Sequence, residues 1–153
     1  MAASAQKITY TATPEQIESM HEEFDEALEA IKADYGATYP LIIDGEEITG
    51  RETFDVRPPA NRSVVLGSFQ KGTAEDVDRA VAAANAAFRA WSGRPWQERV
   101  DLVRKAADLI RERKYRLSAF LIHESGKSRA EAIGEIEEGA DLLDEYARQV
   151  EAS

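Results

Sequence analysis

The stretch TAEDVDRAVAAANAAFRAWSG, residues 73–93, decides how the second half of this chain folds. Thr73 is suited to cap a helix, because its hydroxyl can accept a hydrogen bond from a free backbone N–H of the first turn. Ser92 and Gly93 are suited to end that helix. Between these ends, apolar residues recur at steps of three and four, at Val77, Val81, Ala84, Phe88 and Trp91. The stretch therefore predicts one helix with an apolar stripe.

Three more helical segments are predicted after residue 93. Pro95 starts the first, and the second runs from about Lys114 to Gly126. The last follows Ser128, because Ser128 and Glu131 have the spacing of a capping box. The apolar positions of the first are Trp96, Val100, Val103, Ala107 and Ile110, and those of the second include Leu117, Phe120 and Leu121. Those of the last are Ile133, Ile136, Ala140, Leu143, Ala147 and Val150.

Short strands are predicted before residue 73. Asp44-Gly45, between the segments 39–43 and 46–48, is the commonest short signal for a β-hairpin with a type I′ turn. Residues 53–56 and 64–69 indicate two further strands, which the Pro-rich and polar segment 57–63 separates. The predicted strands therefore all lie within residues 39–69.

A helix is also predicted near the amino terminus, within residues 13–38. Thr13 can act as its N-cap, Pro14 fits the first helical position, and Gln16 completes a capping box. Its apolar stripe, which ends before Gly36, comprises Ile17, Met20, Phe24, Leu28, Ile31 and Tyr35. Residues 1–12 are small and polar without a period, and they are predicted to be a flexible arm.

The order of these elements indicates an α+β fold that is rich in helix. Residues 39–153 would form its main part, with strands at 39–69 and helices at 74–150. Three or four short strands are few for a self-sufficient sheet beside so many helices, so the sheet looks unfinished.

Composition bounds the function. The 153 residues are 43% hydrophobic and 31% charged, which fits a globular unit. The formal net charge of −10 would repel nucleic acid, so no nucleic-acid partner is expected. The acidic bias is compatible with a high-salt cytoplasm or with an ordinary acidic surface. No segment has the apolar length of a signal peptide or a membrane span, and the chain is predicted to be cytoplasmic with no membrane partner.

The familiar short motifs argue against a cofactor or metal site in this chain. Gly126-Lys127-Ser128 matches only the end of a phosphate-binding loop, because Leu121 stands where the motif needs glycine, and a helix-to-helix turn is favoured. No GxGxxG dinucleotide motif is present. His21 and His123 lack the spacing of zinc ligands, and the chain contains no cysteine. We therefore expect no catalytic, cofactor-binding or metal-binding residue in this chain.

A group of carboxylates lies on the last predicted helix, at Glu135, Glu137, Glu138, Asp141 and Asp144. A solvated helix face is the favoured interpretation of such a group. Glu138, however, lies opposite the Ile136 stripe and shares its side with Leu142 and Tyr146. If both faces of the helix are covered, Glu138 lies near a partner surface or a ligand.

The order of residues across the chain resembles the aldehyde dehydrogenase family. The resemblance rests on residues 73–81 with Phe88 and Trp91, on Glu98-Arg99, and on Glu124-Ser125-Gly126-Lys127 followed by Glu131-Ala132. Residues 14–36, Tyr39-Pro40-Leu41 and residues 141–148 narrow it to the Δ1-pyrroline-5-carboxylate dehydrogenase branch. It covers about residues 14–152, and Arg57-Pro58-Pro59 departs from the pattern where relatives often have Asn-Pro.

The resemblance implies a role for the whole enzyme that this chain cannot perform alone. Members of the branch oxidise L-glutamate γ-semialdehyde to glutamate with NAD, in proline catabolism, and the matched motif places a substrate-contacting glutamate at Glu138. They need a cysteine nucleophile, which this chain lacks. The resemblance therefore implies an amino-terminal segment of the α/β dehydrogenase fold, inactive by itself and without the catalytic domain. Its expected partner is the remainder of the dehydrogenase or an intact subunit, in an enzyme expected to be a homo-oligomer.

Three points stay open at this stage. A stand-alone module that binds or regulates an intact dehydrogenase is an alternative, and an unrelated helical binding domain is a weaker one. The choice between NAD and NADP is also open, and so is the aldehyde that the whole enzyme prefers.

Overall fold

The computed structural model describes residues 14–152 and contains five α-helices, one short 3₁₀ helix and five strands in that range. The helices are α1 (Pro14–Ala30), η1 (Ile31–Asp34), α2 (Ala74–Ser92), α3 (Trp96–Glu112), α4 (Lys114–Ser125) and α5 (Arg129–Ala152). The strands are β1 (Ala37–Tyr39), β2 (Leu41–Ile43), β3 (Glu46–Ile48), β4 (Thr53–Val56) and β5 (Gly67–Gln70). The predicted α+β, helix-rich fold is confirmed. The predicted arm at 1–12 and the cap at Thr13 lie outside the described residues.

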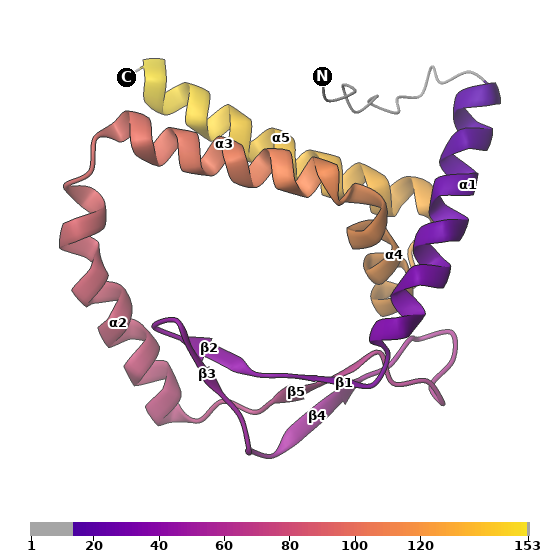
Figure 1. Cartoon of the computed structure of the whole chain (residues 1–153), viewed down its shortest axis with the longest axis horizontal. Coiled ribbons are helices and arrows are strands. Elements are labelled where there is room, and N and C mark those ends of the chain that lie inside the picture. Colours follow the sequence, from indigo (N-terminus) through magenta and orange to yellow (C-terminus); the bar gives the residue numbers. More distant parts are fainter. Residues whose placement is uncertain (1–13, 153) are drawn as a thin grey trace.

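The elements form a ring in Figure 1, with α3 and α5 side by side opposite the strands. At one end of the helix pair, α4 packs against α5 and α1. At the other end, α2 connects α3 to the strands and contacts β2. A small core lies where α1, α4 and α5 meet, and it contains Met20, Phe24 and Ile133 with Tyr115 and Ile122 packed against it.

The strands form two small sheets. In the first, β5 pairs in parallel with β1 and antiparallel with β4, and in the second, β2 pairs antiparallel with β3. Asp44 and Gly45 have φ values of 56° and 77°, which confirms the predicted type I′ turn between β2 and β3.

The predicted strand at 39–43 and the predicted helix at 13–38 have other limits in the structure. Tyr39 belongs to β1 and Leu41 to β2, so the chain changes sheets at Pro40, which has no N–H to donate to a ladder. The α-helix ends at Ala30 and the 3₁₀ helix at Asp34, because the chain then turns into the sheet, where the Gly36 N–H donates to the Val65 carbonyl.

The predicted strand at 64–69 begins later, at Gly67. The Val64 N–H donates to the Asn61 carbonyl within a turn, so that the paired segment follows this turn.

The start of α2 is held by the predicted cap. The Thr73 hydroxyl accepts from the Asp76 N–H, and the Asp76 carboxylate accepts from the Thr73 N–H at 2.8 Å. Hydrogen bonds from Thr73 to the Asp76 carboxylate lower the pKa of Asp76. Arg51 donates to the same carboxylate at 2.9 Å, which ties the loop before β4 to this helix.

The apolar stripe of α2 is exposed in this chain. Val77, Val81 and Phe88 are 61%, 55% and 67% exposed, although their spacing is that of a core-facing stripe. Trp91 at the end of the same stripe is also exposed. Contiguous exposed apolar surface of this kind generally marks an interaction site.

We therefore expect the isolated chain to bind a hydrophobic dye and to self-associate. The exposed α2 stripe supplies the binding surface, so replacing Phe88 by Ser should lower the dye fluorescence, whereas Ala86→Ser on the opposite face should leave it unchanged. Dye fluorescence and sedimentation velocity measure the two properties. A monomer with a sharp unfolding transition and no affinity for the dye would contradict this expectation and would favour an autonomous module.

Candidate functional site

The candidate site lies on the outer face of α5. The helix starts at the predicted capping box, in which the Glu131 N–H donates to the Ser128 hydroxyl and the Ser128 N–H donates to the Glu131 carboxylate at 3.0 Å. The hydrogen bonds from Ser128 also lower the pKa of Glu131. The inner face of α5 packs on α3 and α4 and buries Ala132, Ile133, Ala140 and Ala147. Val150, at the end of the predicted inner stripe, is 47% exposed.

Glu138 points away from this packed face. Its side chain is exposed, and within residues 14–152 it makes no hydrogen bond or ion pair. Leu142 and Tyr146 follow on the same side and are also exposed. The chain itself therefore leaves Glu138 free to bind a group from elsewhere.

Two glycines lie on or beside the same face of α5. Glycine inside a helix costs about 1 kcal/mol relative to alanine. Gly134 and Gly139 nevertheless occupy interior positions, and nothing lies within 4 Å of the place where a Cβ would stand. The packing within this chain does not require them. They leave the surface beside Glu138 open to close approach.

The other four carboxylates of the predicted group have cationic partners. Glu135 pairs with Lys127, and Glu137 lies 3.3 Å from the Lys114 Nζ. Asp141 and Asp144 lie 3.0 and 2.7 Å from the Arg111 Nη2. The favoured interpretation of one solvated face is therefore wrong for Glu137, whose side chain is only 13% exposed. Helical periodicity could not predict the pairing of these carboxylates with Lys114 and Arg111, because the two cations lie on other helices.

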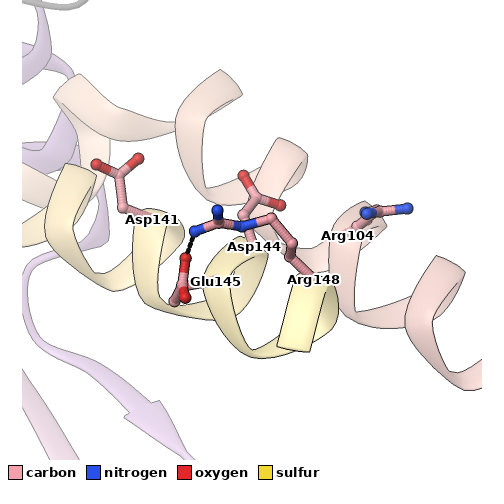
Figure 2. A pocket seen from close by; sticks show the side chains of 5 residues that line it. All are labelled: Arg104, Asp141, Asp144, Glu145 and Arg148. Carbon is pink, nitrogen blue, oxygen red and sulfur yellow. Dashed lines mark ion pairs between the residues drawn. The ribbon is translucent and has the colours of Figure 1, made fainter. Parts of the chain in front are cut away.

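An open depression of about 530 Å³ is lined by residues from the middle of α3 and the second half of α5. Figure 2 shows its lining side chains, which are Arg104, Asp141, Asp144, Glu145 and Arg148. Both arginines already have carboxylate partners within the chain. Arg104 donates two hydrogen bonds of 2.6 Å to Glu151, and Arg148 forms an ion pair with Glu145. Glu138 is not among the lining residues, so this depression is separate from the candidate site.

The other predicted motifs have structural roles. Gly126 ends α4 in the left-handed conformation with φ of 77°, which confirms a helix-to-helix turn in place of a phosphate-binding loop. His21 of α1 contacts Arg129 of α5, and His123 of α4 contacts Tyr35, which follows η1.

Within residues 14–152, no group of three or more His, Asp or Glu side chains is arranged to hold a metal ion. No helix in this range is long and apolar enough to cross a membrane.

The comparison with protein families decides the identity of the fold. Residues 46–153 match the family described as "Aldehyde dehydrogenase family". The chain belongs to this family. The predicted resemblance is confirmed. The chain is an amino-terminal segment of the aldehyde dehydrogenase fold, as predicted.

Curated members of the aldehyde dehydrogenase family resemble the chain over most of its length. The 1-pyrroline-5-carboxylate dehydrogenase of Staphylococcus haemolyticus is 41% identical over 129 residues, which are 84% of this chain and 25% of that protein. The protein of the same name from a Geobacillus species is 37% identical over 88% of this chain and 26% of its own length. The chain therefore spans about a quarter of these dehydrogenases.

Solved structures of aldehyde dehydrogenases agree with the fold. A 1-pyrroline-5-carboxylate dehydrogenase from Thermus with bound NAD has a TM-score of 0.83 and 32% identity, and the match covers 97% of this chain and 28% of that one. Proline utilization A from Bdellovibrio bacteriovorus has a TM-score of 0.84 and 28% identity, with coverage of 97% and 15%.

Proposed function

We propose that this chain is the amino-terminal segment of a dehydrogenase that oxidises L-glutamate γ-semialdehyde, the open form of Δ1-pyrroline-5-carboxylate, to glutamate in proline catabolism. The observation that carries the proposal is Glu138, an exposed carboxylate without a partner in residues 14–152. It stands on a helix of a fold that 1-pyrroline-5-carboxylate dehydrogenases share over nearly the whole chain.

Glu138 would bind the ammonium group of the substrate. A carboxylate accepts hydrogen bonds from an ammonium, and hydrogen bonds to charged groups contribute about 1.5–3 kcal/mol. The open surface at Gly134 and Gly139 leaves room for the substrate or a neighbouring segment to approach the helix backbone. An aldehyde without an amino group would gain nothing from this contact, so Glu138 would serve specificity.

Within residues 14–152, the helix N-terminus that follows a strand does not fit the phosphates of a nicotinamide cofactor. A dinucleotide phosphate commonly binds at a free helix N-terminus that follows a strand. The helix that follows β5 is α2, and its N-terminus already holds the carboxylate of Asp76, which would repel a phosphate. When bound, NAD accepts a hydride from the substrate. We assign that cofactor, and a cysteine nucleophile, to the rest of the enzyme.

The chain would therefore act as a scaffold and as one wall of the substrate site. The exposed stripe of α2, at Val77, Val81 and Phe88, offers the apolar surface that the rest of the dehydrogenase would cover. The rest of the dehydrogenase would also add strands to the two small sheets. We place the whole enzyme in the cytoplasm and expect it to assemble from identical subunits.

The test is an assay of the assembled enzyme, with this segment joined to its catalytic remainder. Initial rates of NAD reduction are compared for L-glutamate γ-semialdehyde and for an aliphatic aldehyde of equal length without the amino group. We expect a higher kcat/KM for the amino-bearing substrate. Equal values would reject the proposed substrate. Failure of the segment to restore turnover, together with tight binding to an intact dehydrogenase, would favour a regulatory module.

A further inference from the structure

A buried cation lies where α3, α4 and α5 meet. Lys114 is the first residue of α4 and is only 6% exposed. Its Nζ lies 3.3 Å from Glu137 Oε1 on α5. A buried charge of either sign is costly unless it is paired, so each of these two groups restrains the position of the other.

Arg111, in the last turn of α3, extends this contact along α5. Its Nε lies 3.8 Å from Glu137 Oε2, so both oxygens of Glu137 face a cation. Its Nη2 then reaches Asp141 and Asp144. Positions 137, 141 and 144 form one stripe on the helix, and this stripe is attached to the junction of α3 and α4.

Apart from Ile133 near its N-terminus, the buried residues of α5 are alanines, and these restrain its rotation less closely. The buried residues that face α3 and α4 include Ala140 and Ala147, and Ala107 of α3 is also buried. Methyl groups form smooth contacts without a preferred direction, whereas an ion pair with hydrogen-bond geometry has one. The ion pairs therefore add a directional restraint on the rotation of α5 to the packing of Ile133 at its first turns.

Glu138 is the next residue after Glu137 and lies about 100° further around the helix. A helix with its side chains has a radius of about 5–6 Å, so a rotation of about 20° moves a side-chain end by about 2 Å. A displacement of about 1 Å in a positioned group can cost about 100-fold in rate. The position of Glu138 thus depends on the contact that holds Glu137.

We infer that Lys114, through its buried ion pair with Glu137, is a positioning residue that sets the rotation of α5 and so the place of Glu138. The inference rests on the proposed function, in which Glu138 binds the substrate ammonium. Lys114 itself touches no substrate. Its effect is to make the enzyme discriminate between aldehydes with and without an amino group.

The test replaces Lys114 by Met in the assembled enzyme and measures the ratio of kcat/KM for L-glutamate γ-semialdehyde to kcat/KM for the aliphatic aldehyde. We expect this ratio to fall at least tenfold. In a Glu138→Gln background, Lys114→Met should change the ratio by less than twofold, because Lys114 acts through Glu138. An equal loss of efficiency for both aldehydes would overturn the inference.

Two further variants keep the test decisive. Lys127→Met removes an exposed ion pair to Glu135 on the same helix and should leave the ratio within twofold of the parent value. Lys114→Met with Glu137→Gln removes both buried charges, so it remains informative if the single variant fails to fold. A ratio equal to that of the parent enzyme in the double variant would overturn the inference.

Crystal structures of the parent and the Lys114→Met enzyme separate this inference from the proposed function. We expect the Glu138 carboxylate to move by about 1 Å or more, and an unmoved carboxylate overturns the positioning role. If Glu138→Gln leaves the ratio unchanged while Lys114→Met moves the carboxylate, the substrate contact is wrong and the positioning role stands.

Discussion

The isolated chain is expected to produce no reduced cofactor when it is mixed with L-glutamate γ-semialdehyde and NAD. Aldehyde oxidation of this type needs a thiolate that forms a thiohemiacetal with the substrate, and the 153 residues contain no cysteine. The N-terminus of α2 is filled by Asp76 and does not offer a phosphate site. Because enzymes accelerate reactions by about 10⁶-fold or more, the loss should be complete within detection.

Absorbance of the reduced cofactor measures this prediction directly. The positive control is the same segment joined to its catalytic remainder, under the same conditions and at equal concentration. Activity that stays with the 17.0 kDa chain at constant specific activity through repeated purification would contradict the prediction. It would mean that the catalytic groups have been assigned to the wrong part of the enzyme.

Replacing Glu138 by Gln is expected to reduce kcat/KM for L-glutamate γ-semialdehyde at least tenfold in the assembled enzyme. Gln keeps the shape of the side chain but loses the charge that a substrate ammonium would meet. The Gln amide oxygen can still accept a hydrogen bond, so the loss is that of the charge, about 1.5–3 kcal/mol, which corresponds to about 10- to 100-fold in efficiency. Efficiency with the aliphatic aldehyde should stay within twofold, because that substrate has no ammonium group.

The same substitution should barely affect folding. Glu138 is exposed and has no partner in residues 14–152, so the free energy of unfolding should change by less than about 1 kcal/mol. Urea unfolding of the parent and variant chains measures this change. Glu135→Gln, one turn earlier on α5, is the matched control and should leave the substrate preference unchanged. An equal loss with both aldehydes in Glu138→Gln would show that Glu138 has a structural or general electrostatic role.

Local signals in the sequence predicted the ends of several elements correctly. The cap at Thr73, the capping box at Ser128 and the turn at Asp44-Gly45 all appear in the structure. In each case the partners lie within three residues of one another. Backbone sterics and short-range hydrogen bonds settle such features before any long-range contact forms. The spacing of apolar residues likewise predicted the inner face of α5, which packs on α3.

The limits of other elements depended on distant partners. The chain leaves its first helix after Ala30 and later pairs with β5, which is about thirty residues away in sequence. It changes sheets at Pro40, and periodicity cannot reveal which sheet a short apolar segment joins. The stripe of α2 has a core-facing pattern but stays exposed, because no described element covers it in this chain.

By itself, the sequence determined the types of the elements, their caps and turns, and the side of α5 on which Glu138 lies, because these follow from sterics and from the 3.6-residue repeat. Only the tertiary structure decided that Glu137 is held by Lys114 and Arg111 while Glu138 is left free. That difference arises where three helices meet, between side chains more than twenty residues apart in sequence. Adjacent carboxylates thus acquire different surroundings from packing that no local pattern encodes.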